Sequence, residues 1–217
     1  DGIRDVAVTG VQTCALPISG PYQTALGTYE VMATEKLMFS LTVLTESVGY
    51  VVGVGLEQDI STLNNYIGSD SYGTGVYSDG RVINSGGNIY EGLSVNFNYA
   101  GAVVDLCFDA STMQIWYRAD GGDWNGDALA DPATNAGGLA IPGPALPCRP
   151  GVSMIASGSN FPSWTINPTA TYATPSGFTF VAGNGSAQPP AGKKILIEGS
   201  LTDAILMESG DYILQEI

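Results

Sequence analysis

Short apolar segments recur along the middle of the chain, from about residue 22 to residue 180. Residues 37–45 read LMFSLTVLT. Met38, Ser40 and Thr42 alternate there with Phe39, Leu41 and Val43. This period of two is expected of a strand with two different faces. Residues 49–56, GYVVGVGL, form a nearly continuous apolar run, which is typical of a central strand covered on both faces.

Turn signals separate these segments. In residues 74–87, TGVYSDGRVINSGG, Asp79 and Gly80 form the dipeptide preferred in two-residue hairpin turns, where both central positions need a positive φ. Residues 113–124, MQIWYRADGGDW, predict a strand that leaves through Gly121 and Gly122. Further strands are predicted in 103–111, 151–157, 163–169 and 174–181. Strands every dozen or so residues, with no long helical pattern, predict an all-β sandwich or barrel.

Composition agrees with short strands joined by tight turns, since there are 29 glycines and only 13% charged residues. Seven Lys and Arg face 21 Asp and Glu, a net charge of −14, which repels nucleic acids and anionic membranes. The chain has no histidine, which removes Ser-His and Cys-His nucleophiles and histidine-ligated zinc. No apolar run approaches the roughly 18 residues of a membrane helix. We expect a soluble protein without a cofactor or a nucleic-acid partner.

The first 19 residues, DGIRDVAVTGVQTCALPIS, show neither strand nor helix periodicity. They begin with acidic residues, and Gln12 and Thr13 interrupt the apolar positions, so a secretory signal is not predicted. Written back into codons, the stretch resembles a common short-read sequencing adapter, with Val6 and Ala7 at the place of a variable index. We expect residues 1–19 to be a translated library artefact in a reading frame from environmental DNA; the alternative is a natural disordered leader.

The C-terminal end differs from the middle of the chain. Residues 183–194, GNGSAQPPAGKK, have the composition of a linker. They are followed by three related units, ILIE at 195–198, ILME at 205–208 and ILQE at 213–216. Each unit predicts a short strand and a turn, and three of them cannot bury a core alone. We therefore expect a sandwich over 20–182, a linker, and a β-repeat tail over 195–217 that packs on the sandwich or on another copy of the chain.

The cysteines leave two alternatives open. Cys14 lies in the leader, Cys107 in the strand-like VVDLCFDAS and Cys148 in the loop ALPCRPG. Spacing cannot establish a bridge between Cys107 and Cys148. The favoured interpretation is a core thiol and an unrelated loop thiol, and the redox compartment stays open.

One long motif is unusual: residues 115–138, IWYRADGGDWNGDALADPATNAGG, join an aromatic pair, a glycine turn, WNG and ADPAT. Together with KLMFSLTVLT, YVVGVGL, LNNYIGSDSYGTGVYSDGRVINSGG, RPGVSM and TINPTATYATPSGF, it resembles the SPRY domain, and more narrowly the SPRY-type domains of bacteriophages and prophages. The resemblance covers about residues 29–178. Ser40 stands where the family usually has Glu, and TINPTA stands where it tends to have an Asn-Phe-Gly turn.

The resemblance implies a concanavalin-like, jelly-roll sandwich of two antiparallel sheets. It also implies binding, rather than catalysis, through loops at one end of the sandwich. Aromatic rings beside amide and carboxylate groups suit sugar recognition, and two loops of the chain carry such sets. The candidate binding residues are Tyr72 and Tyr77 in GSDSYGTGVY, and Asp123, Trp124, Asn125 and Asp127 in DGGDWNGD. The alternative is that Trp124 packs over the mouth of the sandwich while its polar neighbours cap turns.

A calcium site in the second loop is not expected. Its acidic and amide residues alternate as in a calcium loop, but Ala128 replaces the expected glycine and no Glu stands at the closing position.

A glucanase would need two carboxylates on one strand face. Glu57 and Asp59 have the spacing but lie where a strand passes into a loop, and Asp105 and Asp109 flank Cys107 in an ordinary sandwich strand. We therefore expect no enzyme activity.

We expect a binding or structural module of a phage or prophage virion, in its tail or an appendage, which recognises a partner protein or a host surface glycan. The alternative is an extracellular lectin-like domain of a bacterial surface or secreted protein.

Overall fold

The structure is a computed structural model, and it describes residues 22–27, 29–45, 52–58, 65–155 and 163–182. The predicted leader (1–19), linker (183–194) and repeat tail (195–217) lie outside the described residues, as do Cys14 and Asp59. The predicted division of the chain therefore stays a prediction.

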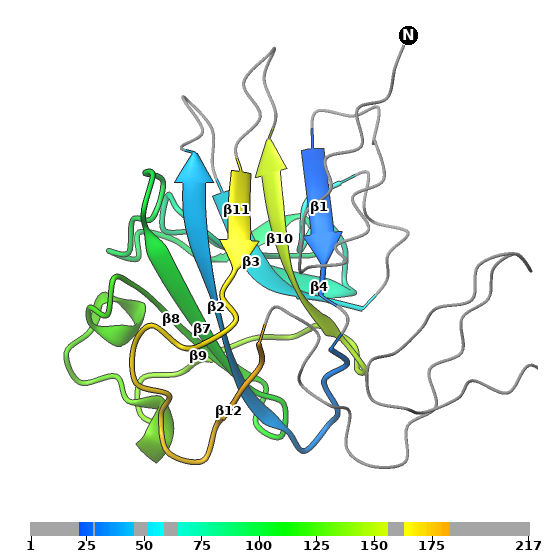
Figure 1. Ribbon diagram of the computed structural model, residues 1–217. Helices are drawn as coiled ribbons and strands as arrows, with labels where there is room; N and C mark the ends of the chain where they lie inside the picture. Colours follow the sequence, from blue (N-terminus) through cyan, green and yellow to red (C-terminus); the bar gives the residue numbers. More distant parts are fainter. Residues whose placement is uncertain (1–21, 28, 46–51, 59–64, 156–162, 183–217) are drawn as a thin grey trace, which may run out of the picture.

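Two sheets face each other and form a β-sandwich, as Figure 1 shows. All pairings are antiparallel except that of β12, which runs parallel to β2. The first sheet has the order β1 (Tyr22–Leu26), β10 (Arg149–Ile155), β3 (Val52–Glu57), β4 (Gly73–Tyr77), β5 (Val82–Asn84) and β6 (Gly87–Tyr90). The second sheet has the order β11 (Ser163–Ile166), β2 (Lys36–Thr45), β7 (Val103–Asp109), β8 (Gln114–Ala119) and β9 (Leu139–Ala140), with β12 (Thr179–Phe180) beside β2. The predicted all-β sandwich is confirmed.

The alternation predicted for β2 separates two cores. Phe39 and Leu41 point between the sheets, where they join a large buried cluster, whereas Met38 joins a second cluster on the other face of the same sheet. Because successive side chains of a strand point to opposite faces, the one alternating segment contributes to both cores. The inter-sheet core includes Leu37, Val54, Leu56, Val76, Val104, Leu106, Phe108, Tyr117 and Val152.

Strand β3 lies inside the first sheet, between β10 and β4, as its apolar run predicts. Its outward positions include Gly53 and Gly55, and the ring of Tyr77 lies over Gly53 and over Gly75 of β4: a Cβ would stand 2.4 Å from that ring on Gly53 and 2.9 Å from it on Gly75. The Tyr77 hydroxyl donates a hydrogen bond of 2.8 Å to the carbonyl of Ile67. Tyr77 therefore belongs to a buried strand and not to an exposed glycine-rich loop, and it is only 4% exposed.

The turn at Asp79 and Gly80 differs from its prediction. The Tyr77 N–H bonds to the Arg81 carbonyl and the Gly80 N–H bonds to the Tyr77 carbonyl, which makes a three-residue loop with a positive φ at Gly80 and not at Asp79. This is the common hairpin of a type I turn followed by one left-handed residue. The two-residue turn with both φ values positive lies one hairpin later, at Ser85 and Gly86.

The outer face of the second sheet is also closed. Met38, Cys107 and Trp116 are neighbours across three strands and are fully buried there. Trp124 and Ala130 complete this cluster, and two rings pack against it: Phe178, from the segment between β11 and β12, and Phe180, from β12 itself. Figure 1 shows this segment, in yellow and orange, passing along the second sheet.

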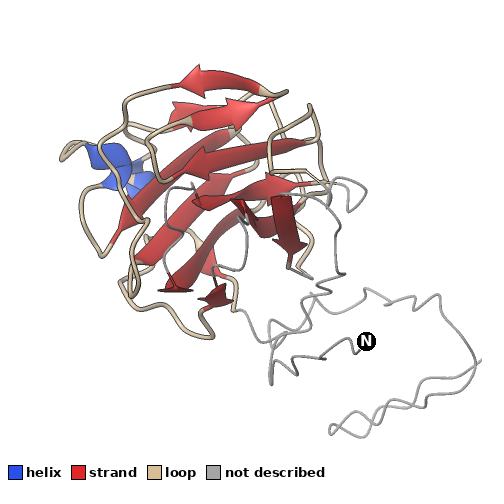
Figure 2. Cartoon of the chain, turned by 90° about the horizontal axis from the view of Figure 1, so that it is seen from above, coloured by secondary structure: helices blue, strands red, loops and turns tan. Residues whose placement is uncertain are grey.

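Helical structure in the described residues is limited to two short 3₁₀ turns, η2 (Trp124–Gly126) and η3 (Pro132–Thr134). Figure 2 shows them at one side of the sandwich, beyond the strands. None of the described helices approaches the length or apolar content required to traverse a bilayer. Cys107 and Cys148 are both buried and both free, which agrees with two unrelated thiols rather than a bridge.

Candidate binding site

The segment that follows β8 is fixed to the sandwich by Asn125. Strand β9 pairs with Gln114 and Ile115, and among the described residues no strand lies beside the rest of that edge of β8. Asn125 Oδ1 accepts from the Tyr117 N–H at 3.0 Å, and Asn125 Nδ2 donates to the Gly137 carbonyl at 2.8 Å. Asn125 has a φ of 54° and is 7% exposed. Its side chain thus replaces the missing strand, because a buried backbone N–H requires a partner.

Trp124 is part of a stack that also holds a buried ion pair. The guanidinium carbon of Arg118 lies 4.1 Å from the centre of the Trp124 ring and 5.6 Å from that of Tyr172. Arg118 Nε also pairs with Asp105 Oδ2 at 2.9 Å. Burial raises the pKa of Asp105, although Arg118 and Ser40 act to lower it. Trp124 is 8% exposed and has a cation over its ring, so it does not present an open surface on which a sugar could stack.

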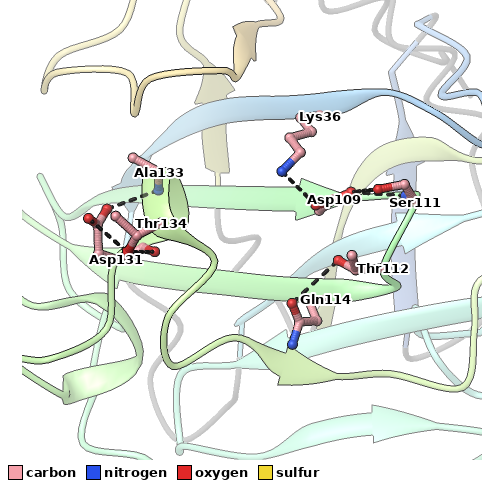
Figure 3. A network of polar contacts seen from close by, with 8 residues as sticks. All are labelled: Lys36, Asp109, Ser111, Thr112, Gln114, Asp131, Ala133 and Thr134. Carbon is pink, nitrogen blue, oxygen red and sulfur yellow. Dashed lines mark hydrogen bonds and ion pairs between the residues drawn. The ribbon is translucent and has the colours of Figure 1, made fainter.

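The acidic residues of the following loop cap turns. Asp127 Oδ1 accepts from the Leu129 N–H at 2.9 Å, and Asp131 Oδ1 accepts from the Ala133 N–H at 2.9 Å at the start of η3. Figure 3 shows the second of these caps, together with the ion pair between Lys36 and Asp109. Such caps are the usual role of Asp in turns.

A groove opens at the end of the sandwich where β4, β7 and β8 meet their loops. It consists of two adjoining cavities of about 390 Å³ and about 330 Å³. We call it the end groove; Ser94, Val95 and Asn96 line both cavities. The first cavity adds Ser78, Asp79, Leu93 and Asn98, and the second adds Tyr99, Ala119, Asp120, Gly122, Asp123 and Gly126.

Three carboxylates line the end groove, Asp79 from the turn after β4 and Asp120 and Asp123 from the segment after β8, and none of its lining residues is cationic. Asp79 is paired with Arg81 at 2.6 Å. Asp120 accepts from the Tyr99 hydroxyl and, at 2.9 Å, from the Val103 N–H. The hydrogen bond to Asp120 raises the pKa of Tyr99 to about 12.

Asp123 differs from the other two carboxylates. It precedes η2 but makes no capping bond, and its side chain is exposed and without a partner among the described residues. The end groove therefore offers one uncommitted carboxylate in the cavity that is also lined by Tyr99, which is 39% exposed.

A buried hydroxyl lies beneath this region. Tyr117 is fully buried, and its hydroxyl has no hydrogen-bond partner within the described chain. It packs in the same core as Val95 of the groove floor, and Asp79 is the charged group that acts on it. Burial, followed by the charge of Asp79, raises the pKa of Tyr117. Asp79 also lines the end groove, so the buried Tyr117 side chain and the groove share this charged neighbour.

The structure separates the residues predicted to bind. Asp123 lines the end groove, Trp124 and Asn125 lie buried behind it, and Asp127 caps the next turn. Tyr72, 49% exposed, precedes β4, whereas Ser78 and Asp79 follow β4. Tyr72 therefore lies at the opposite end of that strand from the end groove.

Sequence patterns missed Asn96, Tyr99 and Asp120. They lie in connections between strands, and the pairing of β7 with β8 places Tyr99, which precedes β7, beside Asp120, which follows β8. The one signal was the dipeptide Asp120-Gly121, in which both residues have a positive φ, as in a tight hairpin turn.

The carboxylates weighed for glycoside hydrolysis are engaged elsewhere. Asp105 and Asp109 lie on the outer face of the second sheet, where they pair with Arg118 and with Lys36 (2.8 Å). Glu57 is buried, and its Oε1 accepts from the Gln58 N–H. Within the described ranges, no three His, Cys, Asp or Glu side chains gather as a metal-ligand set.

Solved structures of the same fold exist. The SPRY domain of human HERC1 has a TM-score of 0.51 and 15% sequence identity, covering 68% of this chain and 83% of the human domain. Another human SPRY domain has a TM-score of 0.49 and 15% identity, covering 68% of this chain and 85% of its own. No family model and no curated protein matches the sequence. The likeness to the HERC1 domain shows a SPRY-like fold, as the motif resemblance implied.

Proposed function

We propose that the chain is a non-catalytic protein-binding module and that the end groove is its recognition surface. The observation that carries the proposal is the groove itself, in which residues from three separate loops meet around adjoining cavities on a rigid sandwich. Binding residues commonly lie on loops that a rigid scaffold positions.

Two further features support this choice. The loops of the end groove are held by internal bonds, since Asp120 ties the turn after β8 to Val103 and Asn125 ties the next segment to β8. Fixed loops lose little conformational entropy on binding. The other exposed face that a concanavalin-like sandwich can offer, the outer face of the second sheet, is covered here by the Trp124 and Phe178 segments.

The test is a selection of binders from a random-peptide display library against the full chain. Selected peptides should lose affinity at least about tenfold for Ser94→Trp, because Ser94 is exposed, lines both cavities and would fill them with an indole. They should bind Tyr72→Ser as they bind the unsubstituted chain. The opposite result, with affinity lost on Tyr72→Ser and kept on Ser94→Trp, would place recognition at the other end of β4 and overturn the proposal.

A host surface glycan is the second candidate ligand, favoured by an exposed aromatic ring, Tyr99, which lines the same cavity as the carboxylate of Asp123. Binding on a glycan array that is lost on Tyr99→Ala would support it.

The finer parts of the proposal rest on sequence motifs. The resemblance of residues 115–138 supports a phage or prophage virion protein, and tail or capsid genes beside the gene would test this. The back-translation supports an artefactual origin of residues 1–19, which resequencing the gene would test. Association of copies through residues 195–217 would appear as a concentration-dependent mass that is lost on deleting them.

A further inference from the structure

We propose that the end groove binds an arginine side chain of its protein partner, with the guanidinium against the ring of Tyr99 and bonded to Asp123. This inference rests on the proposed function and adds the chemical class of the bound residue. The argument depends on which hydrogen-bonding groups the groove offers and which of them are already used.

The groove presents acceptors and lacks positive charge. It is lined by the carboxylates of Asp79, Asp120 and Asp123 and by the hydroxyl of Ser94, whereas the Oδ1 of Asn96 already accepts from the Asn98 N–H at 3.0 Å. The Tyr117 hydroxyl is buried without a partner among the described residues, in the core that also holds Val95. The nearby cations are committed, since Arg81 pairs with Asp79 and Arg118 pairs with the buried Asp105. A ligand that brings several donors and a positive charge is therefore the complementary one, and guanidinium has five N–H donors in one plane.

The chain already holds one guanidinium in the same way a short distance behind the groove. Arg118 lies against the Trp124 ring and pairs with Asp105. Tyr99 and Asp123 repeat this combination of an aromatic ring and a carboxylate in one cavity that is open to solvent. Arginine suits it better than lysine, because a planar guanidinium stacks on aromatic rings and bonds carboxylates through two parallel N–H groups.

Overall charge favours the same partner. The chain has a net charge of −14, so an arginine-bearing segment is attracted at long range and the attraction is screened by salt. Asp123 is uncommitted and exposed, so a bound guanidinium would not have to displace an existing ion pair.

The test uses two defined peptides and the full chain labelled with ¹⁵N. The first is Ac-Gly-Ser-Arg-Ser-Gly-NH₂, and its twin carries citrulline, which has the same shape without the charge. We expect the arginine peptide to shift the amide resonances of residues 94–99 and 119–126, and the citrulline peptide to shift them much less. Asp123→Asn should weaken the arginine peptide about 3- to 10-fold, and 0.5 M salt should weaken it further.

Glu91→Gln is the matched control, because it removes the same charge from an exposed carboxylate that does not line the groove. Equal weakening by Glu91→Gln and Asp123→Asn would show a general field effect and overturn the inference. Equal shifts with both peptides would overturn it while leaving the groove as a peptide-binding surface. Absence of shifts with the arginine peptide would also overturn it, and the display selection separately decides the proposed function.

Discussion

The replacement Asn125→Ala tests whether this residue belongs to the scaffold or to the ligand surface. In the structure, its side chain bonds the Tyr117 N–H at 3.0 Å and the Gly137 carbonyl at 2.8 Å. Alanine would leave both backbone groups without these partners. The Tyr117 N–H is buried, whereas Gly137 is exposed and water can reach its carbonyl.

The expected loss follows from this difference. A buried backbone group without a partner costs about 1–3 kcal/mol, and the partly hydrated carbonyl adds less. The backbone of residue 125 is left-handed, with a φ of 54°. Asn tolerates this conformation better than Ala because its short polar side chain can form local hydrogen bonds, so the replacement costs about a further 1 kcal/mol of stability. We expect Asn125→Ala to lower the free energy of unfolding by about 3 kcal/mol.

Asn135→Ala is the matched control. Asn135 also has a positive φ, 64°, but it is exposed and no side-chain bond holds it among the described residues. It should therefore lose only the conformational part, about 1 kcal/mol. Urea unfolding followed by circular dichroism measures both, and the difference of about 2 kcal/mol corresponds to roughly 4–8 °C in Tm for a chain of this size. Equal losses for the two variants would refute the structural role of Asn125.

Two further predictions concern the second sheet and its cover. Burial acts to raise the pKa of Asp109, but its ion pair with Lys36 and its bonds from Ser111 lower that pKa below its usual range. These bonds therefore stabilise the fold at pH values above the ordinary carboxyl pKa, and their contribution is lost as pH falls through the lowered pKa. The difference in the free energy of unfolding between the unsubstituted chain and Asp109→Asn should shrink between about pH 5 and pH 2. A difference that stays constant with pH in urea unfolding would contradict this. Gly121→Ala would place a Cβ 2.6 Å from the Tyr172 ring at a φ of +70°. We therefore expect the free energy of unfolding to fall by about 2 kcal/mol or more in the same assay. An unchanged urea midpoint would show that the ring does not lie there.

The strands were predictable because their signal is local. The alternation in β2 follows directly from the period of side chains along a strand, and the glycine-rich apolar run of β3 indicated a strand covered on both faces. Tyr77 was misplaced because the glycines near it suggested a loop, whereas Gly53 and Gly75 leave room for its ring over the sheet. Glycines spaced two apart on a predicted central strand are thus a signal for an aromatic cover.

The binding surface was only partly predictable. The sequence brought Asp123 to attention, but it could not show that Trp124 faces Arg118, because the segment after β8 folds back on that strand through the bond between Asn125 and the Tyr117 N–H. Tyr99 and Asp120 meet at the end groove because β7 pairs with β8, which places the residues before β7 beside the turn after β8. Such tertiary meetings carry no periodic pattern that a single sequence reveals.

The central claim is that recognition takes place at the end groove of a SPRY-like sandwich. Hydrogen exchange of the full chain, measured with and without a display-selected peptide, tests it most directly. We predict slower exchange in residues 78–81, 93–99 and 119–126, and unchanged exchange in residues 65–72. Protection confined to residues 65–72 and 141–147, at the other end of β4, would contradict the claim.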